Sequence, residues 1–157
     1  MKRFAVVSVT TLAVLGLLAQ QALADNPHFV QGPTTSVTVS GNEVDLNLSF
    51  KAAGLGNATA YATWSLDGSG TLFSRCYNRG GNKPQADNKQ ETVDIGATFE
   101  TAVNHGNTTF NGTVATVTST LTCPGNQVVR IESFSATGTL SLVGGTLTAD
   151  LSWTFPS

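Results

Sequence analysis

The chain has 157 residues, of which 40% are hydrophobic and 11% are charged, and its formal net charge is −2 at pH 7. This length is sufficient for one domain with a hydrophobic core. The ten acidic residues outnumber the eight basic ones. The charge balance therefore gives no support for nucleic acid or an anionic membrane surface as a partner.

The first 24 residues predict a cleaved signal peptide. Lys2 and Arg3 form a short positive region, and an apolar run follows from Phe4 to Leu18. Ala22-Leu23-Ala24 is the small-x-small pattern that signal peptidase recognises, so we expect cleavage before Asp25. A retained membrane anchor is the alternative, but the run is short for a helix that must cross about 30 Å of hydrocarbon. We therefore expect a secreted, extracellular domain over residues 25–157 with no membrane span. Losing the two positive charges takes its formal charge from −2 to −4.

The remaining sequence predicts antiparallel strands throughout. Apolar and polar residues alternate with period two over residues 43–51, 92–100 and 147–155. Such alternation is typical of strands with one face in a core and the other in water. Turn sequences divide the chain into eight or nine strands and leave no segment with helical periodicity. These turns are Gly41-Asn42, Asp67-Gly68-Ser69-Gly70, Asn104-His105-Gly106-Asn107, Pro124-Gly125-Asn126 and a two-residue hairpin at Gly144-Gly145.

Two of these strands change the parity of their apolar positions part-way. The change falls between Val114 and Val117 in one strand and between Ile131 and Phe134 in the other. Because one extra residue reverses every following side chain, each strand should carry a bulge or cross between two sheets. The predicted fold is an all-β antiparallel β-sandwich, immunoglobulin-like or jelly-roll-like. A small outer-membrane barrel is the alternative, but outward Ser, Thr and Asp side chains without aromatic girdles do not suit lipid.

Cys76 and Cys123 are the only cysteines. An even pair in an exported chain predicts one disulfide, which would stabilise the fold by about 4 kcal/mol at most. Two buried free thiols or a redox pair are the alternatives, although catalytic dithiols usually lie close together in sequence. A disulfide requires the two Cα atoms to lie within about 7 Å of each other.

Basic residues gather around the longest segment predicted to be irregular, Cys76–Lys89. The candidate binding residues here are Arg75, Tyr77, Arg79, Lys83 and Lys89. Gly80-Gly81 would allow close approach of the backbone to a ligand, and a guanidinium can pair with a carboxylate, phosphate or sulfate. The alternative is a solvated loop that carries charge because no core is available there. The segment lacks the Gly-Lys-Ser/Thr sequence of a phosphate-binding P-loop.

No catalytic or metal-binding pattern stands out, so we expect no catalytic residues, no metal and no cofactor. His28 and His105 are isolated from each other and from any recognisable nucleophile or acid. A small secreted hydrolase would need two facing acids, for which the outward pairs are Glu43 with Asp45 and Asp94 with Glu100. Whether the chain is an enzyme stays open, and the sequence leans against it.

Exposed aromatic residues would point instead to a carbohydrate-binding module. Trp64 and Trp153 share the parity of core residues, and only Tyr61 and Tyr77 are expected to be exposed. The preferred hypothesis is a non-enzymatic extracellular protein with a surface-binding or interaction role. Its partner would be an unknown extracellular ligand, a cell-wall polymer or a protein.

Three stretches of the sequence carry a resemblance to a known group. They are FKAAGLGN (residues 50–57), CYNRGGNKPQADNK (76–89) and CPGNQ (123–127). Together they resemble a group of small, signal-bearing secreted proteins of filamentous actinobacteria, in which the loop usually reads Cys-x-Asn-x-Gly-Gly-x-x-Pro. The likeness covers about residues 45 to 135. It implies export and a shared β fold, and it carries over no catalytic residue because no activity is established for the group.

Overall fold

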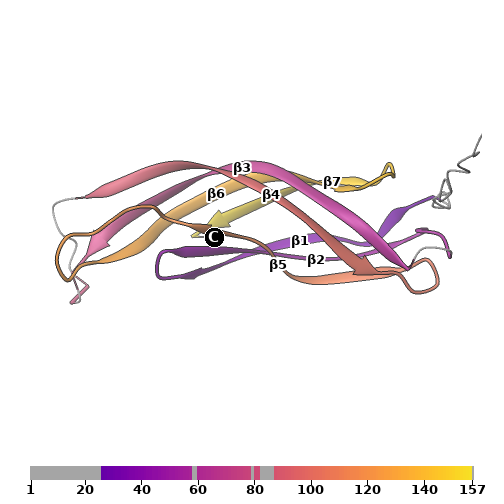
Figure 1. Cartoon of the computed structure of the whole chain (residues 1–157), viewed down its shortest axis with the longest axis horizontal. Helices are drawn as coiled ribbons and strands as arrows, with labels where there is room; N and C mark the ends of the chain where they lie inside the picture. Colours follow the sequence, from indigo (N-terminus) through magenta and orange to yellow (C-terminus); the bar gives the residue numbers. More distant parts are fainter. Residues whose placement is uncertain (1–25, 58–59, 79, 82–86, 157) are drawn as a thin grey trace, which may run out of the picture.

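Two antiparallel sheets make up the computed structural model, which describes residues 26–57, 60–78, 80–81 and 87–156 (Figure 1). Within these residues every regular element is a strand, as the period-two alternation predicts. The seven strands are β1 (His28–Ser40), β2 (Glu43–Ala53), β3 (Tyr61–Tyr77), β4 (Asn88–Ala102), β5 (Thr108–Thr118), β6 (Val128–Leu142) and β7 (Thr148–Phe155). The first sheet has the order β1-β2-β5 and the second has the order β4-β3-β6-β7. The described part of the chain holds no helix long and apolar enough to cross a membrane.

The prediction of eight or nine strands is wrong because Asp67–Gly70 is not a turn. These residues lie inside β3, which runs without a break over 17 residues. Gly68 and Gly70 are needed there because β6 passes unusually close. A Cβ atom on Gly68 would lie 2.3 Å from the main-chain oxygen of Thr137. The two glycines therefore mark a close approach of two backbones within a sheet, a role that a single sequence does not distinguish from a turn.

The final hairpin also differs from the prediction of a two-residue turn. The main-chain NH of Leu142 donates to the oxygen of Leu147 over 2.9 Å, so the turn spans the four residues 143–146. Gly144 adopts a positive φ of 75° within it. The two predicted glycines, Gly144 and Gly145, therefore lie in the turn, which also includes Val143 and Thr146.

Both predicted parity changes are confirmed as β-bulges. In β5, Thr113 and Ala115 pair with consecutive residues of β2, which leaves Val114 as the extra residue. In β6, Ile131 and Ser133 pair with consecutive residues of β3, which leaves Glu132 as the extra residue. Each bulge returns the apolar side chains that follow it to the core face.

The core lies between the two sheets and includes both tryptophans, as predicted. The indole rings of Trp64 and Trp153 come from the second sheet. The ring of Phe50, from β2 in the first sheet, packs edge-on against Trp64 with ring centroids 4.7 Å apart. Trp64 Nε1 donates to Thr101 Oγ1 over 2.9 Å, so its polar atom is satisfied inside the core.

The sheets also meet along their edges. Thr35 Oγ1 on β1 donates to the main-chain oxygen of Ser152 on β7 over 2.5 Å, and β4 is followed directly by β5 through a short turn. Residues 119–127, here called the crossing segment, carry the chain from β5 in the first sheet to β6 in the second. Figure 1 shows the crossing segment running towards the end of the long axis at which β3 ends and β4 and β6 begin, and the β4–β5 turn at the other end.

Candidate functional site

The predicted disulfide is present and attaches the crossing segment to β3. Cys76 lies near the end of β3 and Cys123 lies in the crossing segment, with their Cα atoms 5.6 Å apart. The main-chain NH of Cys76 donates to the oxygen of Asp87 over 3.1 Å, which holds the start of β4 beside the same residue. We call this end of the second sheet, where β3 ends and β4 and β6 begin, the disulfide end.

The segment predicted to be irregular, Cys76–Lys89, is shorter than expected. Cys76 and Tyr77 complete β3, and Asn88 and Lys89 begin β4, so the connection between the strands is residues 78–87. Two of the candidate binding residues, Arg79 and Lys83, lie outside the described residues. The other three lie on strands.

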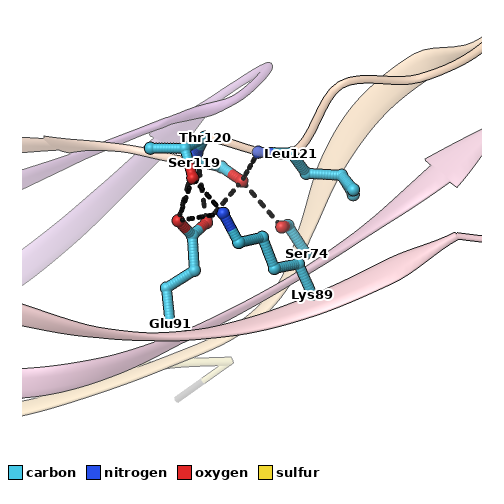
Figure 2. A network of polar contacts seen from close by, with 6 residues as sticks. All are labelled: Ser74, Lys89, Glu91, Ser119, Thr120 and Leu121. Carbon is cyan, nitrogen blue, oxygen red and sulfur yellow. Dashed lines mark hydrogen bonds and ion pairs between the residues drawn. The ribbon is translucent and has the colours of Figure 1, made fainter.

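Lys89 belongs to a polar cluster that holds the crossing segment against the second sheet. The Glu91 cluster consists of Ser74, Lys89, Glu91, Ser119, Thr120 and Leu121 (Figure 2).

Glu91, on β4, is the centre of this cluster. Its carboxylate accepts hydrogen bonds from Ser119 Oγ at 3.0 Å and from the main-chain NH of Thr120 at 3.1 Å. It also accepts one from the Thr120 hydroxyl and pairs with Lys89 Nζ at 3.2 Å. Burial raises the pKa of the Glu91 carboxyl, but hydrogen bonds from Thr120, Lys89 and Ser119 to its charged form outweigh burial. The pKa therefore lies below its ordinary value.

Ser119 connects this carboxylate to the core. Its hydroxyl donates to Glu91 and accepts from the main-chain NH of Leu121 at 3.2 Å. It lies 2.7 Å from Ser74 Oγ, and because its own proton goes to Glu91, Ser74 is the donor in that contact. Ser74 is fully buried and Ser119 is nearly so. Serine, lysine and carboxylate side chains thus lie together, as they do in some active sites. The hydroxyls of Ser74 and Ser119 are buried and already hydrogen-bonded, so this arrangement suits attachment of the crossing segment rather than a nucleophile.

Two charged residues of the disulfide end, Arg75 and Arg130, take no part in the Glu91 cluster. Arg75 on β3 and Arg130 on β6 are direct cross-strand partners. Their neighbours Ser74 and Ile131 point into the core, so both arginines project from the outer face of the second sheet. Within the described residues, neither guanidinium has a carboxylate partner.

Each guanidinium of this arginine pair lies over an aromatic ring. Arg75 Cζ is 5.5 Å from the centre of the Phe73 ring, and Arg130 Cζ is 5.0 Å from the centre of the Tyr77 ring. Such contacts are attractive and restrict the side chains to fewer orientations. Arg130 was not among the predicted binding residues. The inward parity of Val129 and Ile131 places it on the outer face, but only the register between β3 and β6 brings it beside Arg75.

Tyr77 is buried, so the expectation that it is exposed is wrong. Only 6% of its surface is accessible, because β3 extends to this residue and Arg130 covers its ring. Its hydroxyl donates to the Glu132 carboxylate. Tyr61 is 62% exposed, as expected, but it begins β3 at the opposite end of the sheet. The two tyrosines therefore do not form one platform.

A separate hollow lies beyond the ends of β3 and β6, beside the crossing segment, and neither arginine lines it. Its lining residues are Asn78, Pro124, Gly125, Asn126 and Gln127. Tyr77 pairs with Val128 in the ladder, so Asn78 and Gln127 lie one step beyond that pair. Gln127 Oε1 is buried and accepts no hydrogen bond from the described residues.

Of the acids considered for hydrolysis, Asp94 and Glu100 lie too far apart to act as a pair. Asp94 and Glu100 lie six residues apart on β4, which is about 20 Å along a strand. Two-carboxylate glycosidases need separations of about 5 to 9.5 Å. Asp45 instead accepts a hydrogen bond from Thr116 Oγ1 at 2.6 Å on the outer face of the first sheet. The described residues hold no group of His, Cys, Asp and Glu side chains that could bind a metal.

Comparison with known proteins gives no match, either to a protein-family model or to a curated protein. The functional argument therefore depends on the disulfide end itself.

Proposed function

We propose that this chain is a non-enzymatic, secreted protein that binds an extracellular ligand, a cell-wall polymer or a protein partner through its disulfide end. The observation that carries the proposal is the grouping of charge. Of the basic residues that the structure describes, Arg75, Lys89 and Arg130 belong to this end, whereas Lys51 lies on β2 near the other. This end also holds the carboxylates of Asp87, Glu91 and Glu132, which balance its three described cations. The remaining described residues are predominantly acidic, so this end is the less negative part of the surface.

The rigidity of the disulfide end supports a binding role. The Cys76–Cys123 bond and the Glu91 cluster both attach the crossing segment to the second sheet. A binding surface that is already ordered loses less conformational entropy when a ligand binds. Guanidinium groups held on an ordered surface are suited to specific pairing with a ligand anion rather than to non-specific electrostatic attraction.

Export is part of the same proposal. Disulfides persist in oxidising compartments, and the predicted signal peptide would direct the chain to one. Membership of the actinobacterial secreted group is proposed from the resemblance over about residues 45 to 135. An immunoglobulin-like or jelly-roll-like strand arrangement is proposed from the two packed antiparallel sheets. Expression with its own N-terminus in a secreting host should release a protein whose first residue is Asp25. Recovery inside the cell with Met1 intact would contradict export.

The binding role is tested by retention on insoluble extracellular material, such as isolated cell envelopes. Arg130→Glu and Lys51→Glu change the net charge equally but at opposite ends of the sandwich. We expect saturable retention of the wild-type protein, loss of retention in Arg130→Glu and little change in Lys51→Glu. In the first variant the new carboxylate lies opposite Arg75, so the fold should be kept, and a thermal melt checks this. No retention of the wild-type protein would contradict the proposal.

A carbohydrate-binding module is the second candidate, favoured by the exposure of Tyr61. An exposed tyrosine ring on an open sheet face can stack on a sugar ring. This candidate predicts a change in tyrosine or tryptophan emission when a matching glycan is added, and the loss of that change in Tyr61→Ala. An unchanged spectrum across a panel of glycans would exclude it.

A further inference from the structure

We propose that Arg75 and Arg130 form a carboxylate-binding site and that the ligand of the disulfide end is an acidic polysaccharide. This inference rests on the proposed binding function and names the class of ligand. It differs from the predicted loop site, because one of its two arginines lies on β6 and its position depends on the pairing of β3 with β6.

The positions of the two arginines favour an anion between them. Directly opposite residues of antiparallel strands have Cβ atoms about 5 Å apart, and like charges in such a pair repel each other. A carboxylate bound by both guanidinium groups would turn this repulsion into two charge-assisted interactions. Within the described part of the chain no acidic side chain forms an ion pair with either guanidinium.

The type of cation suits a carboxylate. Both groups at the site are planar guanidinium forks held over the rings of Phe73 and Tyr77, and such forks match the two oxygens of a carboxylate, as they also match those of a phosphate or sulfate. Lysine, a common point-charge partner of phosphate, is present at this end as Lys89. Its ammonium is already paired with Glu91.

The surroundings of the arginine pair favour a sugar as the carrier of the carboxylate. Exposed neutral groups able to hydrogen-bond lie on the adjacent positions of the same face, namely Asn88 beside Arg75, and Gln90 and Ser133 beside Phe73. In the other direction the hollow at Asn78 and Gln127 begins about 10 Å along the strand from Arg75.

Gln127 adds an independent observation to this argument. Its buried Oε1 lacks a donor among the described residues, and a buried acceptor without a partner is costly. A sugar hydroxyl entering the hollow is a suitable donor. Neither arginine lines the hollow, so a ligand that contacts both the arginine pair and the hollow must extend over about 10 Å, which suits a polymer better than a small enclosed ligand.

Apolar anchors are scarce here, which argues against a protein partner. Protein interfaces are usually centred on buried aromatic or aliphatic residues. Of the four large apolar side chains exposed in the described structure, Val128 is at this end. Tyr61 and Val143 are at the other end of the second sheet, and Val30 is on β1 in the first sheet. The net negative charge of the remaining surface would also restrict an acidic polymer to the arginine pair.

The experiment separates the carboxylate from the sugar with three probes, using the protein recovered from the medium of a secreting host. Polygalacturonate has both groups, poly-L-glutamate has the carboxylate without the sugar, and dextran has the sugar without the carboxylate. Titration calorimetry should show the tightest binding to polygalacturonate, weakened by added salt. Equal affinity for poly-L-glutamate would assign the site to an acidic protein and overturn the inference.

The variants test the residues. Arg75→Gln with Arg130→Gln should weaken polygalacturonate binding by roughly a hundredfold, since two charge-assisted contacts are lost. Arg75→Lys with Arg130→Lys keeps the charge and should still weaken binding by about tenfold, because the fork is lost. Lys51→Gln, at the other end, should change affinity less than about twofold. Unchanged affinity in both double variants would overturn the proposed site.

The two proposals fail in distinguishable ways. Retention of the wild-type protein on extracellular material without any preference for polygalacturonate would overturn this inference and leave the binding function standing. Absence of retention on extracellular material, together with no binding to the three polymers, would overturn both.

Discussion

The indole Nε1 of Trp153 on β7 donates a hydrogen bond to the main-chain oxygen of Asn47 on β2, at 3.1 Å. Because the two strands belong to different sheets, this bond connects the sheets directly across the core. Trp153→Phe keeps an aromatic ring but removes the donor and some volume. We expect it to lower the free energy of unfolding by about 1 to 3 kcal/mol, measured by urea denaturation. An unchanged midpoint would show that the bond contributes nothing to the packing of the sheets.

The close approach of β3 and β6 predicts different effects of alanine substitution at Gly68 and at Gly96, which lie at neighbouring positions of the β3–β4 ladder. In Gly68→Ala the new methyl group would meet the backbone of β6, so we expect a loss of about 1 to 3 kcal/mol. Gly96, on the adjoining strand β4, has nothing within 4 Å of an added Cβ. Gly96→Ala should therefore stay within about 0.5 kcal/mol of the wild type or stabilise it. Equal melting temperatures for the two variants would contradict this explanation of Gly68.

The disulfide should be a large contributor to stability because it closes a long loop. Cys76 and Cys123 are 47 positions apart, and the chain-entropy argument gives about 4 kcal/mol as the upper value for such a loop. Cys76→Ser with Cys123→Ser should lower the free energy of unfolding by about 2 to 4 kcal/mol in urea titrations without reductant. Reduction of the wild-type protein should have a similar effect. A loss well below 1 kcal/mol would show that the Glu91 cluster alone is sufficient to hold the crossing segment.

Glu91 predicts a specific pH dependence of stability. Its pKa is lower in the folded protein than in the unfolded chain, so the unfolded state binds the proton more readily. The stability that ionised Glu91 contributes is therefore complete above the unfolded-state pKa and is lost as the pH falls through the lower, folded-state value. Glu91→Gln should be less stable than the wild type at neutral pH, and the difference should shrink towards zero in acid.

Glu100→Gln is the matched control for this pH dependence, because Glu100 is exposed on the same strand. Its difference from the wild type should stay small at every pH. A Glu91→Gln difference that persists unchanged below the folded-state pKa would contradict the role given to the charged carboxylate.

Much of the fold follows from the period-two pattern, because a strand with one buried face has apolar and polar residues in alternation. The parity changes before Val117 and Phe134 predict the bulges at Val114 and Glu132, since an extra residue necessarily reverses the faces. The break expected at Asp67–Gly70 was wrong because glycine is equally consistent with a turn and with a close approach of two strands. The difference depends on β6, which is distant in sequence.

The candidate site was only partly predictable for a similar reason. Composition alone identifies the basic segment and its link to Cys76. The pairing of Arg75 with Arg130 requires the register of strands that are separated by the whole of β4 and β5. The burial of Tyr77 and the engagement of Lys89 by Glu91 likewise depend on contacts from other strands. Residue types therefore indicate the region, whereas cross-strand pairing determines which side chains remain available to a ligand.

The most direct test of the proposed function is a side-by-side retention measurement of Arg130→Glu and Lys51→Glu on isolated cell envelopes. Both variants carry the same net charge and differ only in the end of the sandwich that is altered. We predict that retention falls by at least about tenfold in Arg130→Glu and remains near the wild-type level in Lys51→Glu. Equal retention of the two variants would contradict a binding role for the disulfide end.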